Sequence, residues 1–108
     1  MIFICVKGKV KPQYADQWVE LTREFTQATR AEEGNGNLFI DWSRSVENPS
    51  KYVLIEAFKD DAAEAHVTSD HFKQAQADLP RYVQETPEIR NVQMEGDHWD
   101  RLGEFEVS

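Results

Sequence analysis

The chain has 108 residues, the size of a single domain, and its 12 basic and 20 acidic residues give a net charge of −8. Because phosphate neutralisation needs clustered Lys and Arg, which the sequence lacks, this balance argues against nucleic acid and against an anionic membrane surface as partners. One cysteine, Cys5, excludes an intramolecular disulfide and a cysteine-based zinc site. The apolar opening is too short for a signal sequence, and no run reaches the ~18 apolar residues of a membrane span. We therefore expect a cytoplasmic protein.

The first third of the chain predicts a strand followed by a long helix. Residues 2–10 are rich in apolar and β-branched side chains, which favours a strand. Large apolar side chains then recur at spacings of four and three, the period of one helix face. These positions are Tyr14, Trp18, Leu21, Phe25 and Ala28. The helix is expected to end at Gly34-Asn35-Gly36, because Gly and Asn tolerate the left-handed conformation of a C-terminal cap.

The middle of the chain predicts an antiparallel hairpin. Residues 37–45 and 51–58 have strand composition, and Glu47-Asn48-Pro49-Ser50 is typical of the turn between them.

A second helix and a last strand follow. Asp61 and Glu64 have the spacing of a capping box at the start of this helix. Ser69-Asp70 is typical of a second cap or a kink, which would divide the helix into two pieces. Residues 89–95 predict the last strand. Beyond it lies a tail, residues 97–108, that is too apolar for a free end, with Trp99, Leu102, Phe105 and Val107.

The order strand, helix, strand, strand, helix, strand predicts an α+β fold of the ferredoxin-like plait type, βαββαβ. We expect residues 1–96 to form this domain and residues 97–108 to dock on it or on a partner subunit. The third strand is apolar on both faces, with Tyr52, Leu54 and Phe58 on one side and Val53, Ile55 and Ala57 on the other. Two helices cover only one face, so we expect a homodimer whose sheets pack face to face.

Four segments together resemble the antibiotic biosynthesis monooxygenase (ABM) family. They are Glu32-Glu33-Gly34-Asn35, Leu54-Ile55-Glu56-Ala57-Phe58, Ala62-Ala63-Glu64-Ala65-His66 and Ser69-Asp70-His71-Phe72-Lys73. The resemblance covers about residues 1 to 95 and implies a dimeric α+β barrel. The family includes small quinol monooxygenases that use no cofactor, haem-degrading enzymes, and an isomerase that acts on a phosphorylated quorum-sensing sugar.

Departures from two branches of the family bear on the activity. Where the haem-degrading branch has Asn, Trp and a His ligand, this chain has Cys5, His66 and Gln76, so haem is not expected and no cofactor is predicted. The isomerase branch is similar around Glu33-Gly34-Asn35 and Glu56-Ala57-Phe58-Lys59-Asp60. A phosphorylated sugar needs a basic anion site, for which only Arg44, Lys51 and Arg81 are candidates. The isomerase activity remains an alternative hypothesis.

His66 is the first candidate for catalysis, because imidazole acts as a base near neutral pH, and Glu56 is the second. The alternative is a structural pair in which Glu56 satisfies a buried His66 and joins strand to helix. His71 lies five residues after His66, about 140° around one continuous helix, so the two cannot share a metal and none is predicted.

The expected substrate site is a cleft between sheet and helices. Its candidate binding residues are Asn37, Trp42, Arg44, Phe72 and Tyr82. The first hypothesis is that the protein is a cofactor-independent monooxygenase that oxidises a quinol-like or polyketide-type aromatic small molecule. The alternatives are an isomerase of a small polar, phosphorylated sugar-like metabolite and a non-catalytic dimeric binding protein. An apolar pocket of several hundred Å³ would favour the monooxygenase. An anion near Arg44 or Arg81 would favour the isomerase, and a cleft filled by Trp99 or Phe105 would favour the binding protein.

Overall fold

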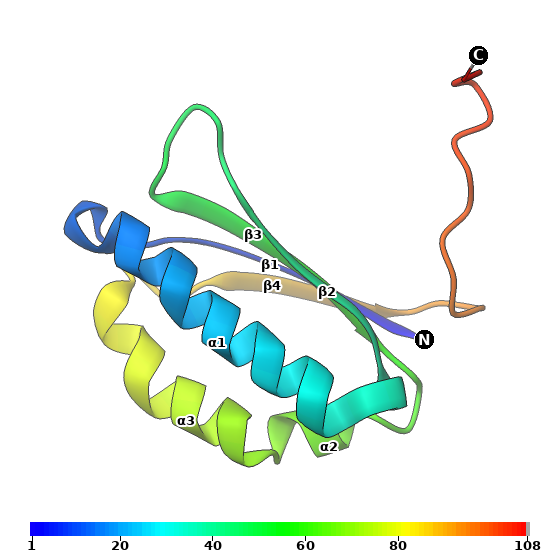
Figure 1. Ribbon diagram of the computed structural model, residues 1–108, viewed down its shortest axis with the longest axis horizontal. Coiled ribbons are helices and arrows are strands. Elements are labelled where there is room, and N and C mark those ends of the chain that lie inside the picture. The colour runs from blue at the N-terminus through cyan, green and yellow to red at the C-terminus, as the bar shows by residue number, and fades with distance from the viewer. Residues whose placement is uncertain (108) are drawn as a thin grey trace.

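The computed structural model places three helices over one face of a four-stranded sheet (Figure 1). It describes residues 1–107, except the side chains of Glu32, Glu33 and Asn35, so three residues of the first ABM-like segment lie outside the described side chains. The strands are β1 (Ile2–Lys9), β2 (Asn37–Arg44), β3 (Lys51–Phe58) and β4 (Glu88–Gln93). The helices are α1 (Ala15–Glu33), α2 (Ala63–Val67) and α3 (Asp70–Asp78), with short 3-10 turns η1 (Pro12–Tyr14), η2 (Gly34–Gly36) and η3 (Leu79–Tyr82).

The sheet has the strand order β2-β3-β1-β4, and every neighbouring pair is antiparallel. The predicted ferredoxin-like α+β fold is therefore confirmed. A register shift between Asn37 and Phe39 marks a bulge at the start of β2. From there Ile40 lies opposite Glu56, which in turn lies opposite Ile4 of β1. This register decides which side chains of the three strands face the helices.

The long helix lies on the sheet through the predicted apolar stripe. Trp18 is buried in a cluster with Val10, Tyr52 and Tyr82. The helix ends at Gly34, whose φ of 51° lies in the region that glycine adopts without steric cost. The expected helix and its end are confirmed.

The second helix is divided in two, as the cap at Ser69 predicts. The Ser69 hydroxyl accepts from the backbone N–H of Phe72 at 3.2 Å and donates to the carbonyl of His66 at 2.6 Å. The predicted capping box at Asp61 is wrong. The helix α2 begins at Ala63 without a side-chain cap, because a backbone turn from Lys59 to Ala62 (N···O 2.9 Å) precedes it.

The other face of the sheet, called here the outer face, carries no helix (Figure 1). Its apolar end holds Phe3 and Phe39, and Trp99 of the tail packs on both, with ring centroids 6.4 and 4.8 Å apart. After Trp99 the tail turns away from the sheet (Figure 1). In the described part of the chain no helix combines the length and the apolar character that a membrane crossing requires.

Candidate active site

A cavity of about 550 Å³ lies between the helix-covered face of the sheet and the helices α1 and α3. Its wall is mostly apolar and includes Val6, Leu54, Ala75, Leu79 and Ile89. The few polar groups come from Glu56, His66, Gln76, Glu85 and Thr86, and none of the described residues that line it is Lys or Arg. A largely apolar pocket of this size with a few convergent polar groups is typical of a small-molecule site.

Glu56 and His66 meet at one side of this cavity. Glu56 is the sixth of the eight residues of β3, where the alternation of the strand turns it toward the helices between the apolar Ile4 and Ile40. His66 is on the short helix α2, and its Nε2 lies 3.8 Å from Oε2 of Glu56. Their exposed fractions are 2% for His66 and 6% for Glu56. An acid and a potential base are thus held together out of solvent.

Aromatic rings enclose the imidazole of His66. The ring centroids of Phe58, Phe72 and Phe25 lie 4.5, 5.1 and 5.7 Å from it. The imidazole of His71 lies 5.8 Å away, because the break between α2 and α3 cancels the rotation expected of one continuous helix. Among the described side chains there is still no group of three His, Cys, Asp or Glu that could hold a metal ion.

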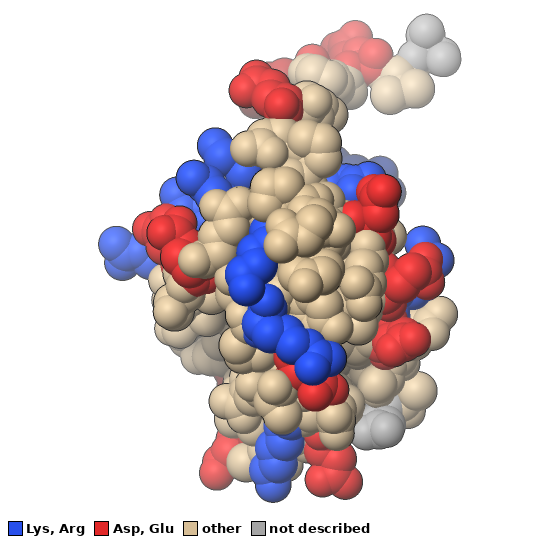
Figure 2. All heavy atoms as spheres, turned by 90° about the vertical axis from the view of Figure 1, so that its left-hand side faces the viewer, with Lys and Arg blue, Asp and Glu red and all other residues tan. Residues whose placement is uncertain are grey.

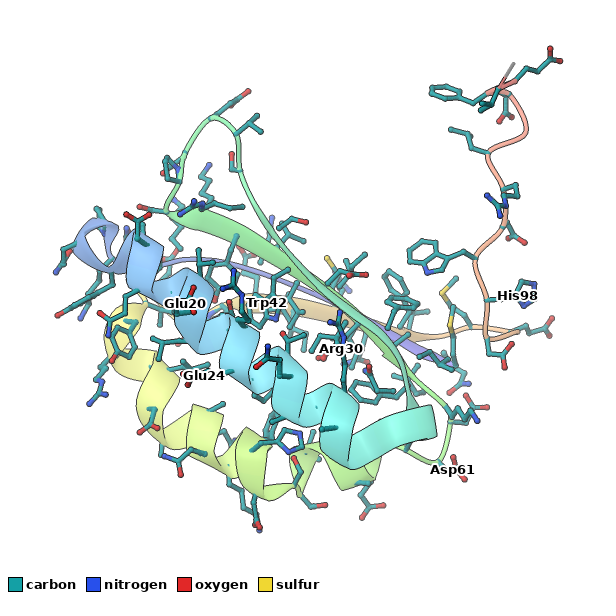
Figure 3. All side chains as sticks on the ribbon, viewed as in Figure 1. Glu20, Glu24, Arg30, Trp42, Asp61 and His98 are labelled. Atoms are coloured by element: carbon teal, nitrogen blue, oxygen red, sulfur yellow. The ribbon has the colours of Figure 1, made fainter. Side chains whose placement is uncertain are left out.

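A second aromatic cluster lines the cavity, formed by Trp18 of α1, Trp42 of β2 and Tyr52 of β3. Their ring centroids are 5.1 to 6.1 Å apart. Figure 3 shows Trp42 between the sheet and α1. Both indole nitrogens are buried without a hydrogen-bond partner among the described residues. Burial raises the pKa of Tyr52 to about 12, so its phenol stays protonated at neutral pH.

Four of the seven predicted site residues, His66, Glu56, Trp42 and Phe72, line the cavity. The other three lie elsewhere. The amide of Asn37 bonds the carbonyls of Phe39 and Ala57 at 3.2 and 3.4 Å.

The guanidinium of Arg44 reaches Oδ1 of Asp16 at the start of α1, at 3.4 Å. Tyr82 is buried in the core, where its hydroxyl accepts from Arg81 at 3.1 Å. The arrangement therefore differs from the predicted one at these three positions.

Several lining residues were not predicted as site residues. Trp18 belongs to the apolar stripe of the long helix, and its size and central place on that stripe are a signal that could have identified it. Glu85 and Thr86 lie in the segment between η3 and β4, which has no periodicity. No pattern in the sequence indicates that this segment closes one side of the cavity.

Fold and site together define a small α+β protein with an apolar cavity and one buried His–Glu pair. The family model for antibiotic biosynthesis monooxygenase matches residues 1–78, and the chain belongs to this family. The resemblance inferred from the sequence is confirmed.

Known relatives agree with this assignment. The "Putative monooxygenase YcnE" of Bacillus subtilis (strain 168) is 32% identical over 74 residues, which are 68% of this chain and 76% of the relative. Two solved structures share the fold. The "putative antibiotic biosynthesis monooxygenase" from Nitrosomonas europaea has a TM-score of 0.79 at 23% identity, covering 89% of this chain and 100% of the other. A protein described in the same words from Deinococcus radiodurans has a TM-score of 0.79 at 21% identity, covering 95% and 100%.

Proposed function

We propose that the protein is a cofactor-independent monooxygenase that oxidises a quinol-like or polyketide-type aromatic small molecule, and that it works as a homodimer. The observation that carries this proposal is the mainly apolar cavity of about 550 Å³ with His66 and Glu56 in its wall. The printed description of the family and of its Bacillus subtilis relative supports the class of reaction.

In such a reaction the substrate itself reduces dioxygen. For an anthrone-type ring, a base removes a proton from the ring methylene and leaves an electron-rich anion. Dioxygen adds to that carbon and forms a hydroperoxide, which loses water to give the ketone. The balance is CH₂ + O₂ → C=O + H₂O, and all four electrons come from the substrate carbon. The protein must bind the ring, take the proton, stabilise the anion and exclude water.

The residues of the cavity match these tasks. His66 accepts the proton, and the neighbouring Glu56 carboxylate stabilises the imidazolium that forms, at the observed separation of 3.8 Å. The ring of Phe72 packs beside the substrate. Trp42 also lines the cavity, and its indole N–H, which has no partner among the described residues, would donate to the oxyanion.

The charge of the cavity argues for an aromatic rather than a phosphorylated substrate. Glu56 and Glu85 line it, and none of its described lining residues is Lys or Arg. A phosphate placed there would meet two carboxylates, with no lysine or arginine to neutralise it. Trp99 packs on the outer face, against Phe3 and Phe39, so the tail does not fill the cavity. Both observations favour the monooxygenase over the isomerase and over a binding protein with a closed cleft.

The homodimer is supported by the outer face of the sheet. Val53, Val92 and Met94 are 40%, 52% and 42% exposed there. Val92 lies opposite Phe3, and Val53 lies opposite Lys7 toward the other end of the face. An antiparallel sheet with one solvated face alternates apolar and polar residues, and this face departs from that pattern. A second copy that packs its own outer face here would bury these side chains.

The activity is tested with purified protein, an anthrone substrate and ¹⁸O₂. We expect one labelled oxygen atom in the ketone, detected by mass spectrometry before exchange with water. His66→Gln should lower the rate at least a hundredfold, the usual contribution of a general base. His98→Gln, in the exposed tail (Figure 3), is the matched control and should leave it unchanged. No label uptake, or equal rates in both variants, contradicts the proposed chemistry.

The dimer is tested separately by sedimentation velocity at micromolar concentration. Val53→Asp places a charge on the outer face and should shift the protein toward the monomer. Val46→Asp, in the fully exposed β2–β3 turn, is the control and should sediment like the wild type. A wild-type protein that sediments as a monomer refutes the dimer without affecting the test of the chemistry.

A further inference from the structure

The outer face has a basic end, opposite its apolar end. A groove of about 460 Å³ crosses all four strands there. Its charged lining residues are four cations and two acids: Lys7, Lys9, Lys51, Arg44, Glu85 and Glu88. We call it the lysine groove. Figure 2 shows this end of the molecule, where Lys and Arg side chains run down the middle of the surface with Asp and Glu side chains beside and below them. This concentration of positive charge stands out in a chain with a net charge of −8.

Two of these lysines are placed unfavourably for the isolated protomer. Lys9 and Lys51 lie directly opposite each other on β1 and β3. Like charges at such a cross-strand pair destabilise a sheet. Lys7 has Glu88 at 4.0 Å, but Lys9 and Lys51 form no ion pair with any described side chain. Arg44 is paired with Asp16 at 3.4 Å, and Glu85 is a second acidic residue of the lining. The charge that the groove offers to a negatively charged partner is therefore mainly that of Lys9 and Lys51.

The tail of the chain has the complementary properties. Residues 97–107 hold four exposed acidic residues, Asp97, Asp100, Glu104 and Glu106, against one exposed arginine, Arg101. Between them lie Leu102 and Phe105, which are 62% and 77% exposed. Apolar side chains in this number and degree of exposure mark a binding segment. The segment has both the charge and the apolar surface to fill a basic groove.

We propose that the tail of one protomer docks in the lysine groove of the other, so that the two tails clasp the dimer. This inference rests on the dimer proposed above. The acidic residues of the tail would pair with Lys9 and Lys51, and Leu102 and Phe105 would pack on Val53 and the aliphatic stems of the lysines.

Docking on the partner, rather than on the same chain, follows from the course of the tail. The tail leaves the sheet at Met94, whose carbonyl accepts a hydrogen bond from the N-terminal ammonium of Met1. Both residues lie at the opposite end of the sheet from the groove. Its own sheet holds it only through Trp99, after which it turns away from the outer face (Figure 1). In a dimer with antiparallel facing sheets, this end lies over the groove of the partner. Eleven residues extend to about 36 Å, enough to cross that face.

Complementary charge reversals distinguish docking on the partner from docking on the same chain. One variant carries Lys9→Glu and Lys51→Glu, and the other carries Asp100→Lys, Glu104→Lys and Glu106→Lys. Each alone should weaken its homodimer at least tenfold in Kd, measured by fluorescence anisotropy, with folding checked by circular dichroism. Mixed together they should form a heterodimer with nearly the wild-type Kd, because each groove then faces a tail of opposite charge.

The controls separate the possible failures. Lys59→Glu with Lys73→Glu reverses two exposed lysines outside the groove and should leave the Kd unchanged. If the mixture shows no gain while all five reversals in one chain restore stability, the tail docks on its own chain and the proposal is wrong. The proposal is also wrong if the Kd of the dimer stays at the wild-type value in every charge-reversal variant. It is equally wrong if the groove binds inorganic phosphate as tightly with the tail present as with the tail removed. A wild-type monomer refutes the dimer itself.

Discussion

Gly8 of β1 lies directly opposite Tyr52 of β3, and the space beside this glycine is occupied by the tyrosine ring. A Cβ at residue 8 would lie 2.7 Å from the hydroxyl oxygen of Tyr52 and 2.9 Å from its Cζ. The ring has little room to retreat, because Trp18 and Trp42 pack on it with centroids 5.1 and 5.6 Å away. We therefore expect Gly8→Ala to destabilise the fold and to displace one wall of the cavity.

Two opposing effects decide the magnitude. Replacing Gly by Ala restricts the unfolded chain, which by itself stabilises a protein by about 0.4–1 kcal/mol. Forcing a methyl group into a filled space costs about 1–3 kcal/mol. The steric term is the larger one here, because the closest atoms belong to a buried ring held by two indoles. The expected net loss is about 1–2 kcal/mol.

Urea unfolding followed by tryptophan fluorescence measures this loss. Gly103→Ala is the matched control, because nothing lies within 4 Å of a Cβ at residue 103, and its stability should equal or slightly exceed the wild type. Adding Tyr52→Phe to Gly8→Ala removes the atom of closest approach and should recover part of the loss. If Gly8→Ala is as stable as the wild type, the packing argument for this wall of the cavity is refuted.

Three further predictions concern the same region. Burial raises the pKa of Tyr52 to about 12, whereas a tyrosine of the unfolded chain titrates near 10. As the pH rises, Tyr52 therefore loses its phenolic proton first in the unfolded chain, so the free energy of unfolding should fall by up to about 2 kcal/mol between pH 10 and 12. Urea unfolding of Tyr52→Phe should lack this loss, and Tyr14→Phe should retain it. Ser69→Ala removes the cap of α3 and should cost about 1 kcal/mol in the same assay, whereas Ser69→Asp should keep most of the stability. Trp42→Phe should weaken binding of a naphthohydroquinone about tenfold, as expected for one lost hydrogen bond, with binding of naphthalene unchanged in a fluorescence titration.

The fold could be predicted because its signals are local and strong. The stripe from Tyr14 to Ala28 has one helix period, and Gly34 ends that helix for a steric reason that needs no tertiary contact. The cap at Asp61 could not be predicted correctly from the residue pattern. A backbone turn that starts at Lys59 competes with the side-chain cap and moves the helix start to Ala63.

The site was only partly predictable, since strand alternation gives the face of a residue but not its depth. Glu56 lies on β3, an inner strand of the sheet, and reaches the cavity. Arg44 has the same parity, but β2 is an edge strand, and the guanidinium extends past α1 to Asp16. Tyr82 lies in a 3-10 turn, whose direction no periodicity indicates, and the turn places its ring in the core.

The lysine groove is a second feature that the sequence pattern alone does not predict. Lys7, Lys9 and Lys51 are spread over the sequence among apolar residues, so no basic cluster is visible in the chain. Pairing of β1 with β3 brings them to one end of one face. Charge patterns that depend on strand register therefore require the structure, even where the strands themselves are predicted correctly.

The buried pair of His66 and Glu56 has a purely structural reading, in which it only joins β3 to α2. A pair with that role alone needs no space beside it, and close packing around it would add stability. Here about 550 Å³ remains open along the same wall, lined by Phe72, Ala75 and other apolar residues that would gain dispersion energy by closing it. The sheet and the helices stay apart where a potential base and an acid are held out of solvent. An open apolar space beside such a pair is not required by folding, and it therefore supports the proposal that a substrate ring binds there.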